Sequence, residues 1–263
     1  MQLQVLPIRL RLLLLALVLL AAFAAAAAQG ERTQHGNLIV SLDGRFEPLS
    51  LPRDRPAPVA VQLRAGLQTS DRSVLPRVTK VELGIPAQGV VTSRGLPVCA
   101  PRRIRDATSA KALEACRPAL IGSGRMIAQV KIANQPPFQV RARLLAFNGK
   151  IGEHRAVIVH GVSTQPPTAV VLPFVIRLRP GRFGTVLVAH VPSTLGPWPR
   201  FARFEMNLFR RYTYKGKRLS YLSAACPIPR ILTAGFASFA KATFTLVGGR
   251  RISTSITRSC RAR

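Results

Sequence analysis

One stretch decides which fold to expect from this sequence: Gly95–Gly124, GLPVCAPRRIRDATSAKALEACRPALIGSG. It is the only segment after the N-terminal region with the composition of a helix, because residues 109–116 are mostly good helix formers. Asp106 or Ser109 can cap this helix at its start, and Pro118 ends it. The sequence therefore predicts one short helix, set between strands.

The sequence on both sides of that stretch has the pattern of β-strands. Short alternating or wholly apolar runs, rich in Val, Ile, Leu, Phe and Thr, are broken repeatedly by Pro or Gly. This pattern is typical of an antiparallel sandwich or of a sheet closed on itself. We expect an all-β, antiparallel β-sandwich-like fold with strands at 37–42, 59–65, 77–85, 125–133, 138–147, 155–162, 169–178, 185–190, 202–214, 218–223, 242–247 and 251–257.

Turn-forming residues separate these strands. Asp43-Gly44, Asn148-Gly149 and Gly248-Gly249 supply the positive φ that tight hairpins need. Proline-rich segments cannot continue a β-ladder, so we expect loops at 135–137, 165–167 and 196–199. We predict one continuous β domain over residues 29–263, with a division into two lobes near 148–153 as the alternative.

Residues 1–28 combine two arginines, an apolar run and a final Ala-Ala-Ala. These are the parts of a secretory signal peptide. We expect cleavage before Gln29 and a location outside the cell or in the cell envelope. An uncleaved membrane anchor is the alternative, because the apolar run nearly reaches the roughly 20 residues that span a bilayer.

Export changes how the four cysteines are interpreted. In an oxidising compartment an even number of cysteines indicates a disulfide framework rather than a metal or thiol site. Four cysteines allow three connectivities. We expect Cys99 to pair with Cys116 and Cys226 with Cys260, because each pair is local in the sequence. The first bridge would staple the helical insertion and contribute roughly 3 kcal/mol through loop entropy.

The chain is strongly basic, with 39 Lys and Arg against 10 Asp and Glu and a formal net charge of +29. Such an excess favours anionic partners at long range, and salt weakens the attraction. We expect anionic envelope polymers or a membrane surface as partners. Secretion argues against a genetic role in nucleic-acid binding, and the sequence identifies no small-molecule ligand.

Cations and aromatics interleave in the segment 209–221, FRRYTYKGKRLSY, on an expected hairpin. Aromatic faces can stack on bases or sugars while guanidinium groups pair with phosphate or carboxylate. The alternative is an ordinary strand pair with its tyrosines on the half-buried side. The candidate polyanion-binding residues are Arg210, Arg211, Tyr212, Tyr214, Lys215, Lys217 and Arg218.

No motif in the chain specifies a reaction, a cofactor or a metal site. The four histidines, His35, His154, His160 and His190, lack metal-binding spacing, and we expect each to be a polar residue of a strand or loop. Gly122-Ser123-Gly124 lacks the outer spacing of a nucleophile elbow. A glycosidase pair such as Asp43 with Glu82 or Glu205 could be assembled only by folding.

Several segments together resemble a set of uncharacterised secreted bacterial disulfide-containing β proteins of unknown function. The resemblance covers most of the expected mature chain and implies an exported, folded, disulfide-bonded unit, with no activity to carry over. The segments are Leu49–Arg53, Gly95–Cys99, Cys116–Gly124, Ala146–Gly149 and Leu219–Pro227.

The residues therefore favour an exported β protein with a binding or structural role at the cell envelope rather than catalysis. Two alternatives remain. One is an extracellular hydrolase acting on a polymer such as a carbohydrate. The other is a polyanion-binding module that uses the basic aromatic hairpin.

The expected export and disulfides can be checked together by intact-mass spectrometry of the exported protein. We expect the mass of a chain that begins at Gln29, with no cysteine alkylated before reduction and all four alkylated after it. A full-length mass, or alkylation without reductant, would contradict this prediction.

Overall fold

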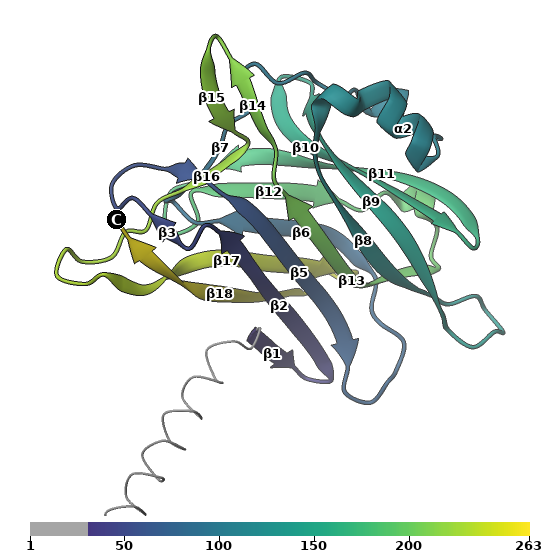
Figure 1. Cartoon of the computed structure of the whole chain (residues 1–263). Helices are drawn as coiled ribbons and strands as arrows, with labels where there is room; N and C mark the ends of the chain where they lie inside the picture. Colours follow the sequence, from purple (N-terminus) through teal and green to yellow (C-terminus); the bar gives the residue numbers. More distant parts are fainter. Residues whose placement is uncertain (1–30) are drawn as a thin grey trace, which may run out of the picture. The chain divides into compact units, whose positions relative to one another are not determined.

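The computed structural model describes residues 31–263, so the expected signal peptide at residues 1–28 lies outside the described residues. The all-β class is confirmed, with one α-helix among the described residues (Figure 1). The strands are β1 (Glu31–His35), β2 (Leu38–Glu47), β3 (Ser50–Leu51), β4 (Ala57–Pro58), β5 (Ala60–Thr69), β6 (Val78–Ile85), β7 (Gly89–Val91), β8 (Leu120–Val130), β9 (Phe138–Ile151), β10 (His154–Thr164), β11 (Pro167–Leu178), β12 (Thr185–His190), β13 (Pro199–Leu208), β14 (Arg211–Tyr214), β15 (Lys217–Ser220), β16 (Leu222–Ala224), β17 (Ala234–Leu246) and β18 (Arg251–Ala262).

Thirteen of these strands form one sheet in the order β1-β2-β5-β13-β8-β9-β10-β11-β12-β6-β17-β18-β3. Its pairings are antiparallel except that of β18 with β3. The sheet is continuous and curled, so its two halves face each other as the layers of a sandwich do (Figure 1). Phe201 on β13 stacks on Phe244 of β17 with ring centroids 5.3 Å apart.

The curl brings the strands near the two ends of the sheet together, although β2 and β18 are not neighbours in the hydrogen-bonded order. Side chains join them instead. Arg258 of β18 donates from Nη2 to the Asp43 carboxylate at 2.6 Å and from Nε to the Gly44 carbonyl at 2.5 Å. Thr33 on β1 also donates to Thr254 on β18. We call this contact between the sheet ends the seam.

Two of the three expected glycine turns are wrong. Asp43-Gly44 lies inside β2, where buried Leu38, Val40, Leu42 and Phe46 continue the alternation past the glycine. A Cβ at Gly44 would lie 2.4 Å from the Phe239 ring, so close packing rather than a turn requires the glycine there.

The second wrong turn is Asn148-Gly149, which lies inside β9. Asn148 is buried and donates to the Pro97 carbonyl at 2.9 Å, which holds the strand against the insertion. The turn to β10 comes later, at Gly152, whose φ is +54°. The Gly248-Gly249 turn is confirmed, with φ values of +84° and +83°.

The helix α2 (Ser109–Cys116) forms where it is expected, in the insertion between β7 and β8. Its cap is Thr108, whose hydroxyl accepts from the Lys111 amide, and not Asp106 or Ser109. Short 3-10 turns at Pro101–Arg103, Arg117–Ala119 and Ser193–Leu195 complete the helical content of the described residues.

Helix α2 packs on the outer face of β9 and β10, where it covers a second, smaller core (Figure 1). Ala112 and Cys116 of the helix are buried with Phe147 and Ile158 of the two strands. The Cys99–Cys116 disulfide closes this insertion. His160 is fully buried in the same region, 3.0 Å from the Ala107 carbonyl, and its burial lowers its pKa.

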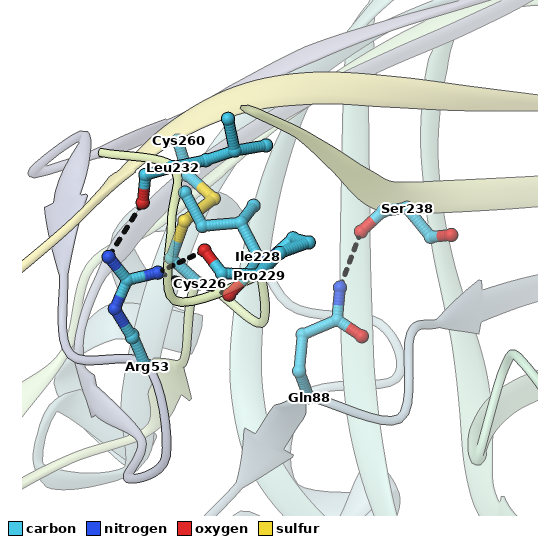
Figure 2. Close-up of a disulfide and its surroundings, with 8 residues drawn as sticks. All are labelled: Arg53, Gln88, Cys226, Ile228, Pro229, Leu232, Ser238 and Cys260. Carbon is cyan, nitrogen blue, oxygen red and sulfur yellow. Dashed lines mark hydrogen bonds between the residues drawn. A yellow bond between two sulfur atoms is a disulfide. The ribbon is translucent and has the colours of Figure 1, made fainter. Parts of the chain in front are cut away.

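One end of the curled sheet is covered by a three-stranded sheet in the order β4-β16-β7, which we call the cap. The Cys226–Cys260 disulfide connects the chain just after β16 to β18. Figure 2 shows how this region is fixed: Arg53 donates to the carbonyls of Ile228 and Leu232, and Gln88 beside the cap donates to the Ser238 carbonyl of β17. Both expected disulfides are thus present.

Because β2 and β18 have no backbone pairing, we expect the Arg258→Ala substitution at the seam to destabilise the fold. The loss should exceed that from removing an arginine that joins two strands already paired through their backbones. We expect Arg258→Ala to lower the free energy of unfolding by about 1–2 kcal/mol, because it removes two charge-assisted hydrogen bonds. Arg64→Ala is the control, since Arg64 contacts the same Asp43 from the neighbouring strand β5. Urea unfolding midpoints measure both, and equal losses would contradict a special role for the seam.

Candidate ligand-binding cavity

The curled sheet encloses a cavity of about 470 Å³. Every second residue of the surrounding strands faces it, as the two-residue period of a strand requires. These inner-face residues are almost all apolar: Val61 and Leu63 of β5; Val81, Leu83 and Ile85 of β6; Met126, Ala128 and Val130 of β8; Val140, Ala142 and Leu144 of β9; Val157 and Val159 of β10; Val170, Leu172 and Phe174 of β11; Phe204, Met206 and Leu208 of β13.

Small side chains on adjacent strands leave this space unfilled. Ala142 of β9 lies opposite Met126 on one neighbour and Ser163 on the other. Two residue pairs further along, on the same face, Gly161 of β10 lies opposite Leu144. The hydroxyl of Ser163 donates to the Pro166 carbonyl at 2.6 Å, so this polar group is already satisfied within the protein. The wall is therefore apolar here as well.

The cap strands β7 and β16 line one end of the cavity. Val91 of β7 and Leu222 of β16 are buried and line it there. Next to them, Tyr221 also lines the cavity with a side chain only 1% exposed. Among the residues that the structure describes, nothing hydrogen-bonds its hydroxyl, and burial raises its pKa.

At the opposite end the lining reaches the surface. Pro166, Thr168 and Trp198 line the cavity and are exposed, with Trp198 49% exposed. They belong to the β10–β11 turn, the start of β11 and the segment that leads into β13. We call this end of the cavity the mouth. The amide of Lys131 donates to the Trp198 carbonyl, which ties two loops of the mouth together.

Two arginines line the cavity, and their surroundings differ. Arg258 at the seam is paired with Asp43. Arg200 at the mouth donates to the Pro197 carbonyl and has no ion-pair partner within residues 31–263. Burial lowers its pKa, and the positive charge of Arg77 lowers it further. The guanidinium stays protonated, so the mouth carries uncompensated positive charge.

In the expected basic aromatic hairpin, Lys215 Nζ lies 5.8 Å from the centroid of the Tyr214 ring. β14 and β15 do form a hairpin, and Arg211, Lys215, Lys217 and Arg218 are exposed on it (Figure 1). Its aromatic rings, however, face the protein. The hydroxyl of Tyr212 donates to the Arg94 carbonyl at 2.9 Å, and a Cβ at Gly95 would lie 2.2 Å from the Tyr214 ring. Arg210 is half-buried and donates to the Pro118 carbonyl.

The carboxylates named as a glycosidase pair are engaged by cations and none of them lines the cavity. Glu205 contacts Arg64 and Arg125, and Asp43 contacts Arg64 and Arg258. Glu82 lies elsewhere, among Lys80, Arg179 and Arg251. No described residue that lines the cavity is an Asp, Glu or His, and residues 31–263 contain no cluster of His, Cys, Asp or Glu that could hold a metal ion.

Sequence reasoning did not find the cavity. Its signal was present in runs such as Val140–Leu144, where the inner positions hold apolar residues and one small alanine. By itself, that alternation indicates only that one face of the strand is buried. Whether such a face is filled depends on which strands lie opposite, and that is set by the curl of the whole sheet.

Comparison with known proteins identifies no relative: no family model, curated protein or solved structure matches the chain. The resemblance to secreted bacterial β proteins therefore stays a prediction. No helix within residues 31–263 is long and apolar enough to cross a membrane.

The cation cluster around Glu82 predicts a pH dependence of stability. Burial alone raises the pKa of Glu82, but attraction to Lys80, Arg179 and Arg251 outweighs it and the net pKa is lowered. A lowered carboxyl pKa contributes stability above the unfolded-state pKa, about 4.3, and this contribution is lost as the pH falls through the folded-state value.

Glu82→Gln should therefore lower the free energy of unfolding by about 1–2 kcal/mol at neutral pH, and the difference from wild type should disappear at a pH below the lowered pKa. Urea unfolding at several pH values measures it. Glu114→Gln, at an exposed position of α2, is the control and should change little. A pH-independent loss for Glu82→Gln would contradict the electrostatic explanation.

Proposed function

We propose that the protein is an exported binding protein that holds a small apolar molecule inside its curled sheet. The observation that carries this proposal is the cavity of about 470 Å³ with its apolar inner-face lining. Pockets that bind small molecules commonly measure about 300–1,000 Å³ and are mostly apolar with few polar groups. An empty apolar space of this size also costs stability, which a bound ligand would recover.

Two further features support binding outside the cytoplasm. Both disulfides are formed, which is typical of an oxidising compartment. The cavity lining offers no pair of carboxylates and no serine with a histidine, so binding explains it better than polymer hydrolysis does. The engaged tyrosines of the β14–β15 hairpin likewise leave polyanion capture with exposed cations alone.

Filling the cavity should abolish ligand binding while the fold persists. Ala142→Phe adds an aromatic ring on the inner face of β9, so we expect at least a tenfold weaker affinity for the neutral fluorescent probe N-phenyl-1-naphthylamine, measured by fluorescence titration. Gln139→Phe places the same ring on the exposed outer face of the same strand and should bind the probe as wild type does. Circular dichroism confirms that both variants fold.

The proposal fails if wild type does not bind the probe. It also fails if the inner and outer phenylalanines weaken binding equally, because the probe would then be held on the surface.

A further inference from the structure

The polar groups around the cavity are distributed unequally between its two ends. At the mouth, Arg200 lines the cavity, and the positive charge of Arg77 contributes to lowering the pKa of Arg200. Within residues 31–263, neither arginine forms an ion pair with a carboxylate. At the seam, the other lining arginine is neutralised by Asp43. The lining at the cap end offers uncharged polar groups: the hydroxyls of Tyr221, Ser223 and Ser238 and the amide of Gln88. Among the described residues that line the cavity, uncompensated charge is therefore found only at the open end. Arg155, which donates to the Val91 carbonyl, lies near the cap but does not line the cavity.

The Arg200 guanidinium is held by the chain around it. It donates to the Pro197 carbonyl, within the segment that also carries Trp198. Arg200 itself is the second residue of β13, and its partner in the register is Gln129 of β8. Arg77 directly precedes β6, whose first residue Val78 lines the same cavity. Within residues 31–263, the Arg200 side chain makes no hydrogen bond other than the one to Pro197.

A half-buried guanidinium that no carboxylate neutralises is unfavourable unless an anion lies with it. An apolar chain in the cavity would carry such an anion to this position if its headgroup were charged. Trp198 suits the boundary between the apolar chain and the charged headgroup, since its ring is apolar and its indole N–H is polar.

We propose that the ligand is an amphiphile with one hydrocarbon chain and an anionic headgroup, a carboxylate or phosphate, whose chain lies in the cavity and whose headgroup is bound by Arg200 with Arg77. This inference rests on the proposed function and adds the ligand class and its orientation. The chain points to the cap and the headgroup to the mouth.

Competition against N-phenyl-1-naphthylamine tests the headgroup. Palmitate and hexadecanol have chains of equal length, and only palmitate is charged. We expect palmitate to displace the probe at a concentration at least tenfold lower, because charge-assisted hydrogen bonds favour it. Raising the salt concentration should reduce this preference. Acetate and inorganic phosphate, which lack the chain, should not displace the probe; displacement by either would show an anion site independent of the cavity and overturn the inference.

Variants at the two ends of the cavity test the orientation. Arg200→Gln should weaken palmitate about tenfold and leave hexadecanol unchanged, and Arg77→Gln should act in the same direction by a smaller factor. Tyr221→Phe removes a polar group from the cap end, and we expect it to keep the preference for palmitate. Loss of the preference in Tyr221→Phe rather than in Arg200→Gln would overturn the assigned orientation, as would an unchanged preference in Arg200→Gln.

The outcomes separate this inference from the proposed function. If Ala142→Phe blocks the probe but palmitate and hexadecanol compete equally, the cavity binds apolar molecules and the anionic headgroup is wrong. If the wild-type protein binds neither the probe nor the two amphiphiles, both proposals fail together.

Discussion

The hydrogen bonds of Arg258 to Asp43 and Gly44 hold β2 and β18 together where no backbone ladder joins these two strands. Thirteen strands pair with one another side by side around the curl. β2 and β18, however, are joined only by hydrogen bonds that side chains donate. The inner face is strongly apolar and would lie in water if the sheet were flat. Hydrophobic burial therefore drives the curl, and the seam fixes where it stops. The cavity exists because the strands are held at that curvature while small residues line part of the wall.

Acidic residues are scarce in this chain, and the structure uses three of them as cross-links. Glu205 connects β5 and β8 through Arg64 and Arg125, Glu82 gathers Arg179 and Arg251, and Asp43 joins the seam. The chain has only 10 acidic residues for 39 basic ones, so most of the basic residues have no acidic partner. The surplus explains why uncompensated arginines such as Arg200 occur, and the place of Arg200 in the cavity lining distinguishes it from a solvated surface cation.

The fold class could be predicted from the sequence because alternation along a strand is a local property. The same holds for the helix at 109–116, whose composition differs from its surroundings, and for the two disulfides, whose partners are near in sequence. Asp43-Gly44 and Asn148-Gly149 were misassigned for the same reason: locally each favours a turn. Phe239 and Ile158, which come near these glycines from other strands, decide otherwise. The cavity depends on such distant neighbours throughout, so no window of sequence reveals it.

The cap has a consequence for how a ligand would be exchanged under the proposed function. Its central strand β16 pairs with β4 and β7 on both sides, and a covalent bond between Cys226 and Cys260 tethers the following residues to the last long strand. Opening at that end would require these pairings to separate against the tether. Under the proposed function, a ligand would therefore enter and leave at the Trp198 side, by the same route in opposite directions.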